Sequence, residues 1–225
     1  MSRLVGIGAT ARPRRLSRWM ATLTNRIQRV TAADAKAVHQ LRLQVFANAR
    51  DFTVAAPENL VWSERDSGDI VLAVWHGADP VSTMRGSVLK NSDEAKAEFE
   101  CSVPASVKFP ALLLARGATR GDFQGIGLNS ALRYHFLSFT VGTRIQSIVG
   151  VVNVGAPRTR VMARLGYEFY LPNMSWGSSL KHNNGVMVAA LDYSRIINAC
   201  SLLERETRQV LAAYPWQGET PRFNV

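Results

Sequence analysis

The stretch "GATRGDFQGIGLNSALRYHF", residues 117 to 136, joins a glycine-rich turn directly to an apolar helical pattern. The residues before it, "FPALLLAR" (109–116), contain a continuous apolar run of the kind found in strands buried on both faces. A helix that begins straight after a strand presents unpaired N–H groups and the positive end of its dipole, and glycines let an anion approach that backbone closely. The stretch is therefore either an ordinary strand-to-helix turn or a cradle for phosphate.

Two common phosphate-binding motifs do not fit this turn. A Walker A loop ends in Gly-Lys-Ser/Thr, whereas Gly127 is followed by Leu128 and Asn129. A dinucleotide-binding fingerprint has a third glycine where this chain has Ser130. If the turn binds phosphate, it does so through a different motif.

The surrounding sequence predicts alternating strands and helices. Buried strands are expected where apolar runs are short, and helices where apolar residues recur every three or four positions. The predicted elements are a strand at 26–31, a helix at 33–50, a hairpin at 69–89, a strand at 109–119, a helix at 127–141, a strand at 145–154, a helix at 155–167, strands at 167–172 and 185–196, and a helix at 197–214. This order predicts a mixed α/β sheet with helices on its faces.

The turn resembles a known signature at this point. The segment Gln124-Gly125-Ile126-Gly127-Leu128 is similar to the acyl-CoA signature Q/R-x-x-G-x-G/A of the GCN5-related N-acetyltransferase (GNAT) superfamily. Arg116, Ala118, Asp122 and Phe123 also stand where that family often has "R-L-A-V-x-P-E-Y-R-G". Downstream, "RVMARLGYEFY" (160–170) is similar to the family's "LYEKLGF". The resemblance, including the order of elements, covers about residues 26 to 195.

The resemblance implies a fold, a co-substrate and a set of binding residues. The fold would be α/β (α+β), with a mixed, largely antiparallel sheet, helices on both faces and a central strand pair, 111–119 and 145–154, that splays apart around pantetheine. Acetyl-CoA or a longer acyl-CoA would be the co-substrate, with no metal. The implied cofactor-binding residues are Ala118, Thr119, Gln124, Gly125, Ile126, Gly127, Leu128, Asn129 and Asn153.

Three features depart from the family pattern. Asn129 replaces the final Gly/Ala of the signature, and Met162 stands where many members have the tyrosine that protonates the leaving thiolate. The segment from residue 104 to 121, where many members place a general base, contains no Asp or Glu. An amine substrate must lose a proton before it attacks, so a base is expected elsewhere. The candidates are Glu100, Asp122, Tyr167 and His182, for each of which a structural or surface role is the alternative, with Tyr167 in the core and His182 in a loop.

The first helix suggests one sub-branch of the family. "HQLRLQVFANARDF" (39–52) resembles the opening of long-chain N-acyl amino acid synthases and acyl-homoserine-lactone synthases, which take acyl groups from acyl-carrier protein as well as from CoA. The alternative is an amphipathic helix that packs on the sheet. An acidic carrier protein would suit the basic residues of this chain.

Charge and composition limit the remaining functions. The chain has 225 residues and a formal charge of +10, but residues 1–29 contain seven arginines and no acid. We therefore expect a basic N-terminal arm at 1–25, which reads as a transit peptide, a segment that binds nucleic acid or an acidic partner, or a solvated extension. A single domain is expected at 26–225. The two cysteines, Cys101 and Cys200, have no metal-type spacing and favour a reducing cytoplasm, and no apolar run is long enough to span a bilayer.

The sequence thus predicts an N-acyltransferase that moves an acyl group from acetyl-CoA to a small-molecule amine. The first alternative is a long-chain N-acyl amino acid synthase-like enzyme that uses acyl-carrier protein. The second is a non-catalytic GNAT-fold module that binds CoA or nucleic acid. The nucleic-acid version is disfavoured because no aromatic-basic surface pattern is found, and the sequence gives no indication of oligomeric state.

Overall fold

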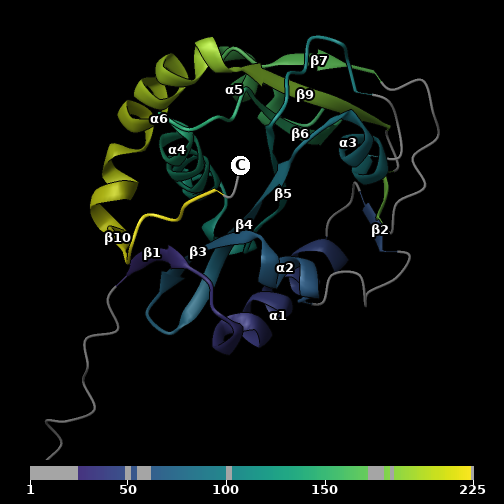
Figure 1. Cartoon of the computed structure of the whole chain (residues 1–225). Coiled ribbons are helices and arrows are strands. Elements are labelled where there is room, and N and C mark those ends of the chain that lie inside the picture. Colours follow the sequence, from purple (N-terminus) through teal and green to yellow (C-terminus); the bar gives the residue numbers. More distant parts are fainter. Residues whose placement is uncertain are drawn as a thin grey trace, which may run out of the picture.

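The computed structural model describes residues 25–48, 52–54, 62–99, 103–171, 180–182 and 185–223. Its centre is an eight-stranded sheet (Figure 1). In spatial order the strands are β10 (Trp216–Gln217), β1 (Arg26–Arg29), β3 (Ile70–His76), β4 (Asp79–Leu89), β5 (Ala111–Thr119), β6 (Ser147–Asn153), β9 (Val186–Asp192) and β7 (Glu168–Tyr170). A separate pair joins β2 (Phe52–Val54) to β8 (Leu180–His182).

The sheet is mixed and largely antiparallel, as expected. Two neighbouring pairs, β10–β1 and β5–β6, run parallel, and the other neighbours run antiparallel. The parallel pair at the centre is joined by a crossover that contains a helix, as parallel strands require. The predicted hairpin is β3–β4, with its turn at residues 77 and 78.

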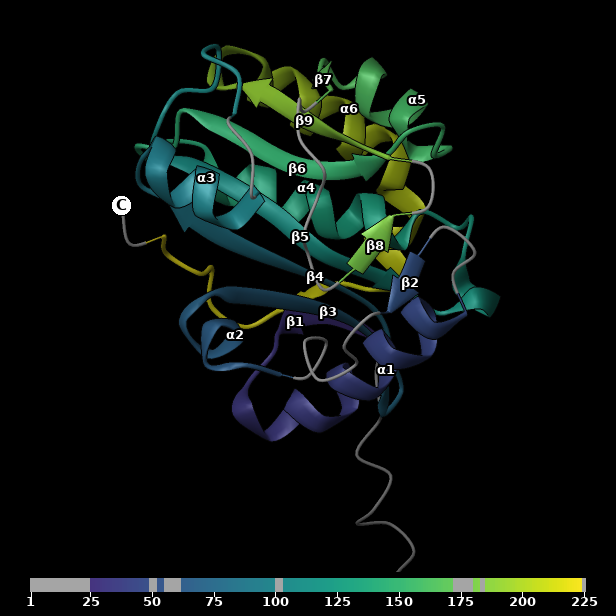
Figure 2. The same ribbon diagram turned by 90° about the vertical axis from the view of Figure 1, so that its right-hand side faces the viewer.

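Helices cover both faces of the sheet, which confirms the predicted fold class. On one face lie α1 (Ala35–Ala47), α2 (Glu64–Gly68) and α3 (Ser92–Phe99), all in front of the sheet in Figure 2. On the other face lie α4 (Leu128–Thr140), α5 (Arg158–Arg164) and α6 (Tyr193–Ala213). The short 3-10 helices η1 (Ala32–Asp34) and η3 (Gly121–Phe123) precede α1 and α4. Within the described ranges, no helix has the length and apolar character needed to cross a membrane.

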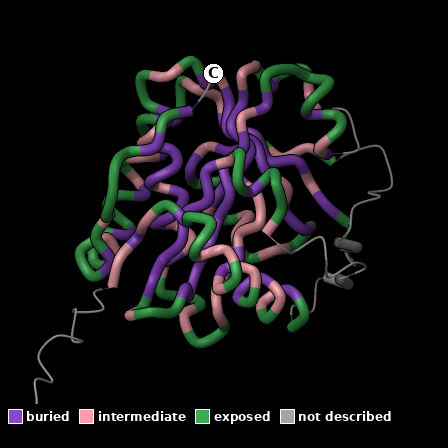
Figure 3. Tube along the Cα trace, turned by 60° about the horizontal axis from the view of Figure 1, so that its bottom comes forward, coloured by how far each residue is buried: buried purple, intermediate pink, exposed green. Residues whose placement is uncertain are grey.

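The core explains why the run in β5 is apolar throughout. Successive residues of a strand face opposite sides of the sheet. Leu112 and Leu114 accordingly pack with Phe136 of α4, whereas Leu113 packs with Phe99 of α3. Buried segments gather at the centre of the molecule and exposed turns at its periphery (Figure 3).

Two expectations about local structure are wrong. The strand predicted at 185–196 ends at Asp192, because the Asp192 carboxylate accepts a hydrogen bond from the Ser194 N–H at 3.0 Å and begins α6 there. His182, expected in a loop, lies in β8, whose pairing with β2 depends on contacts far apart in sequence. The basic arm lies outside the described residues, so the boundary at residue 25 and the single domain at 26–225 stay predictions.

Candidate functional site

The central strands β5 and β6 separate part-way along their length. They pair at Ala111–Ser147, Leu112–Ile148 and Leu113–Val149, and no further pair follows in these two fully described strands. From there β5 continues beside β4, and β6 beside β9. The expected splay is therefore confirmed. It leaves backbone N–H and C=O groups without a strand partner on the two facing edges, and an extended amide-containing ligand matches such edges.

A bulge shapes β5 where the strands diverge. Arg85 of β4 faces Ala115 and Thr83 faces Ala118, so β5 carries one residue more than its partner in this interval. Arg116, inside the bulge, has a φ of +54°, an unusual value for a residue with a side chain.

The bulge also sets the direction of the next backbone groups. The Arg120 N–H donates to the Val81 carbonyl of β4 at 2.9 Å, and the direction of N–H groups alternates along a strand. Thr119 therefore directs its N–H away from β4, toward the gap between β5 and β6.

The glycine turn follows at the end of β5. Gly125 and Gly127 have φ values of +80° and +93°, which side-chain-bearing residues rarely adopt. Gly127 caps α4, and its carbonyl accepts from the Ala131 N–H at 2.9 Å. The N–H groups of residues 127 to 130 have no partner inside the helix. Together with the helix dipole they give this end of α4, directly beside the gap, the chemistry that suits an anion.

Neighbouring side chains fix the turn in place. Gln124 Nε2 donates to the Thr119 carbonyl at 3.2 Å, which ties the turn back to the last residue of β5. On the outer side, a Cβ added at Gly127 would lie 3.6 Å from Cγ2 of Val210, so α6 packs against the turn. The turn is thus held from both sides.

The predicted cofactor-binding residues lie at one end of the central strands, because β5 and β6 are parallel and their carboxyl ends meet there. Ala118 is buried against Phe46 of α1, and the Thr119 hydroxyl hydrogen-bonds that of Ser82 at 2.8 Å. Asn153 is buried at the end of β6. Residues 124 to 129 form the turn and the start of α4, with the Ile126 side chain half exposed. Their roles in binding stay predictions.

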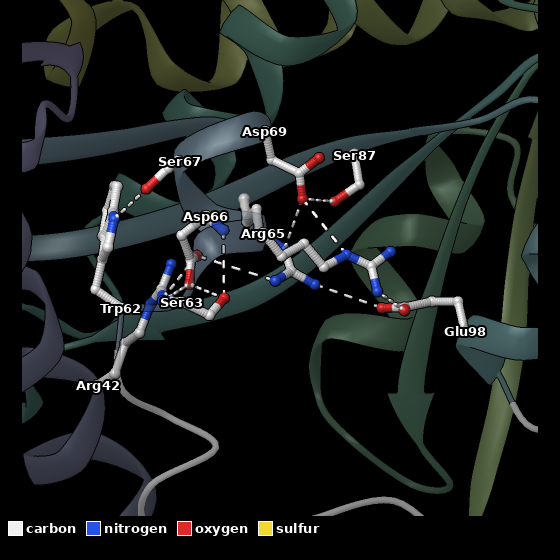
Figure 4. Close-up of polar contacts among 10 residues, drawn as sticks. Arg42, Trp62, Ser63, Arg65, Asp66, Ser67, Asp69, Ser87 and Glu98 are labelled. Atoms are coloured by element: carbon white, nitrogen blue, oxygen red, sulfur yellow. Dashed lines mark hydrogen bonds and ion pairs between the residues drawn. The ribbon is translucent and has the colours of Figure 1, made fainter.

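A buried charged cluster lies on the face of the sheet that α1, α2 and α3 cover (Figure 4). The Arg42 Nη1 and Asp66 Oδ1 atoms are 2.9 Å apart, and both side chains are almost wholly buried. Burial alone raises the pKa of Asp66, but Arg42, the Ser63 N–H and Arg85 outweigh it and hold the pKa below its usual value. Arg85 is 3.5 Å from Asp69 and 3.4 Å from Glu98.

Arg116 extends from the bulge into the same surroundings and forms no ion pair with a described carboxylate. Its Nη1 is buried and makes no hydrogen bond within the described residues. Burial, and then repulsion from Arg85 and Arg42, lower its pKa to about 10, so it remains a cation at neutral pH. With Arg65, which pairs with Asp69 and Glu98, the cluster holds four guanidinium groups against three carboxylates among the described residues. The described part of the cluster therefore carries one more positive than negative charge.

No feature predicted from the sequence included this cluster, although a signal was present. Arg42 stands four residues after Val38 and four before Phe46, so it occupies the apolar face of the first helix. A charged residue at such a position is buried only if it is paired. Asp66 and Asp69 gave no comparable signal, because their buried guanidinium partners, Arg42 and Arg85, come from other elements.

Comparisons with known proteins find similar folds but no similar sequence. No protein-family model matches the sequence, and no curated protein matches it either. Among solved structures, a CoA-dependent acyl-homoserine lactone synthase, BjaI, with SAM and isopentyl-CoA, is similar to this chain at 15% identity. The match covers 89% of this chain and 96% of BjaI, with a TM-score of 0.62. The N-acyl amino acid synthase FeeM from uncultured soil microbes is 10% identical. The match covers 80% of this chain and 99% of FeeM, with a TM-score of 0.57. The GNAT domain of S. lividans PAT is 18% identical. The match covers 75% of this chain and 90% of that domain, with a TM-score of 0.53.

The chain has the GNAT fold. Both the splayed strand pair and the glycine turn before α4 stand at the places that the sequence resemblance implied. At identities of 10 to 18%, the similarity concerns the fold and leaves the chemistry to be argued from this chain's own residues.

The candidate catalytic residues are scattered over this GNAT fold. Asp122 is exposed beside the turn, and its hydrogen bond from Arg120 lowers its pKa. Tyr167 is buried and accepts a hydrogen bond from Arg133 Nη1 at 3.0 Å, while burial raises its pKa. His182 lies in β8, and Glu100 lies outside the described residues. No contact between described side chains joins Asp122 to Tyr167, and their catalytic roles stay predictions.

By the sequence resemblance, Met162 stands where many GNAT members have the tyrosine that protonates the leaving thiolate. Its side chain is 2% exposed and belongs to the core formed with α4 and α6. A thioether cannot donate a proton. If a thiolate leaves at this site, its proton must come from another group or from water.

Proposed function

We propose that the protein is an N-acyltransferase that moves an acyl group from an acyl thioester to an amine by direct attack. The observation that carries the proposal is the unpaired edge of β5, which leads straight into the N–H groups at the start of α4. An acyl-CoA has the matching shape: amide groups along an extended arm, and a pyrophosphate at its end. Acetyl-CoA is the default donor, and the isopentyl-CoA complex of BjaI supports a CoA-type donor.

The backbone N–H that follows the bulge would stabilise the oxygen of the reacting carbonyl. With the pyrophosphate at residues 127 to 130, the acyl carbonyl would lie near Thr119, whose N–H points into the gap. The neutral amine attacks the carbonyl carbon, and the carbonyl electron pair moves to oxygen, where the N–H stabilises the charge. Collapse restores the carbonyl, breaks the C–S bond and releases CoA thiolate. The proton of the new ammonium passes to water or to the thiolate.

The first test is calorimetric titration of the wild-type protein with CoA, acetyl-CoA and a C14 acyl-CoA, followed by single-turnover transfer to a panel of amines. We expect one bound thioester per chain and transfer to at least one amine. Absence of binding by a folded protein would contradict a CoA donor. Binding without transfer to any amine would favour the non-catalytic module, which the Met162 substitution supports.

The charged cluster favours a finer assignment of the acceptor. Arg116 belongs to the bulge beside the proposed acyl site, and its unpartnered guanidinium lies on the α1 face, opposite α4. An acceptor that carries a carboxylate would supply the missing negative charge, and its amine would then lie within reach of the thioester. We therefore infer an amino-acid-like acceptor, as in the N-acyl amino acid synthase FeeM.

Replacing Arg116 with methionine is expected to raise the KM for an α-amino acid acceptor by roughly 30-fold, because a charge-assisted hydrogen bond of about 2 kcal/mol is lost. The KM for the corresponding decarboxylated amine should stay within about twofold. Arg65→Met is the matched control, because Arg65 is half exposed and already paired with Glu98. Equal losses with both acceptors would contradict carboxylate recognition.

The donor could also be carried by acyl-carrier protein. The arginines of α5, Arg158, Arg160 and Arg164, have no acidic residue between them and would suit an acidic carrier. Transfer of a C14 chain from acyl-carrier protein that is faster than from C14 acyl-CoA would support this alternative. Salt-sensitive retention on DNA that is lost on removal of residues 1–25 would instead support a nucleic-acid-binding module.

A further inference from the structure

Asn129 directs its side chain toward the bulge of β5. If Gly117 carried a Cβ, that atom would lie 3.1 Å from Asn129 Nδ2. Gly117 is the residue after Arg116, and its other neighbour at this position is Met84 Cε, at 3.9 Å. The amide group of Asn129 therefore lies over the strand at the bulge, on the α4 side of the sheet.

The Asn129 amide is half-buried and has unused donors. It makes no hydrogen bond to any described residue, and it stands two residues after Gly127, in the first turn of α4. A side-chain amide can donate two hydrogen bonds. Because the side chain is partly exposed over the face of β5, these donors can bond to water or to a bound ligand.

We propose that Asn129 Nδ2 donates a hydrogen bond to the acyl carbonyl oxygen, as a second donor beside the Thr119 N–H. The inference rests on the proposed acyl transfer. It assigns a role to the residue that departs from the small Gly/Ala of the signature, and it explains the glycine at 117, since a side chain there would displace the amide.

The geometry favours the carbonyl over the pyrophosphate as the partner of this amide. The phosphate cradle consists of backbone N–H groups at residues 127 to 130, which point along the axis of α4. The Asn129 amide instead lies at Gly117, two residues before Thr119 in the same strand. As the amine attacks, the oxygen gains negative charge and the hydrogen bond strengthens. The amide transfers no proton, and the electron pair returns when the C–S bond breaks.

The test is a double-mutant cycle with Asn129→Ala and Gly117→Ala. Asn129→Ala should lower the single-turnover rate by about 100-fold, as loss of one preorganised oxyanion donor does elsewhere. The Kd for CoA without an acyl group should change by less than about twofold. Gly117→Ala should give a similar loss, because its Cβ displaces the amide. In the double variant the loss should equal that of Asn129→Ala alone, because the Cβ then has no amide to displace.

Infrared difference spectra of bound acetyl-CoA labelled with 13C at the carbonyl give a readout that does not depend on turnover. The carbonyl stretch should lie at lower frequency in the wild type than in Asn129→Ala. Ser138→Ala, in the last turn of the same helix and away from the glycine turn, is the control and should match the wild type in rate and spectrum.

The outcomes separate this inference from the proposed function. An active wild type with an equally fast Asn129→Ala variant overturns the role of Asn129 alone. Equal loss of affinity for CoA and acetyl-CoA places Asn129 in the phosphate cradle and also overturns it. A wild type that binds acetyl-CoA but transfers nothing contradicts the function, while the infrared shift still decides the hydrogen bond. If acetyl-CoA does not bind, both proposals fail.

Discussion

Replacing Gly125 with aspartate is expected to weaken the binding of acetyl-CoA by roughly 100-fold or more. Gly125 has a φ of +80°, which aspartate tolerates better than most residues, and no atom lies within 4 Å of the added Cβ. The fold should therefore persist. A carboxylate at this position would face the pyrophosphate proposed for the turn, and repulsion at about 4 Å near a protein surface amounts to a few kcal/mol. Calorimetric titration measures the loss.

Gly125→Asn is the matched control for that variant. It has the same shape and the same tolerance of positive φ but carries no charge, so its affinity should fall much less. The difference between the two variants should shrink as salt is added, because ions screen exposed charges. Equal affinities for the aspartate and asparagine variants would contradict a phosphate at this turn.

Replacing Arg42 with methionine is expected to lower the free energy of unfolding by about 3–5 kcal/mol. The change leaves the buried carboxylate of Asp66 without its partner at 2.9 Å, and the next guanidinium, that of Arg85, is 4.0 Å away. Urea denaturation at neutral pH measures the loss. Lys108→Met is the control: Lys108 pairs with Asp192 on the surface, where its side chain is 64% exposed, and its loss should be below about 1 kcal/mol.

The same pair predicts a dependence on pH. In the folded protein the pKa of Asp66 lies below its usual value, so the ionised pair contributes stability above the unfolded pKa of about 3.9. That contribution is lost as the pH falls through the folded pKa. In Arg42→Met the carboxylate has little compensation for burial and takes up a proton more readily. The stability gap between the two proteins should therefore begin to narrow as the pH falls through the raised pKa of Asp66 in the variant, and should go on narrowing until the pH passes the lowered pKa in the wild type. A constant gap would contradict this account.

Local pattern predicted most elements of the fold. The helix expected at 127–141 is α4 at Leu128–Thr140, and the strand expected at 109–119 is β5 at Ala111–Thr119. Both carry their own signals, namely glycines at the turn and an apolar run buried on two faces. The elements that the pattern did not predict, such as β8 and β10, are short strands whose pairing partners lie far away in the sequence.

The sequence alone determined the glycine turn, the order of strands and helices and the departures at Asn129 and Met162, because each depends on residues that are close together in the chain. Only the tertiary structure decided what those residues face. It placed Asn129 over Gly117, and it buried Arg42 with Asp66 while leaving Arg116 unpartnered. Such contacts join α1, α2, β4, β5 and α4, and their energies depend on burial and distance, which residue spacing does not encode.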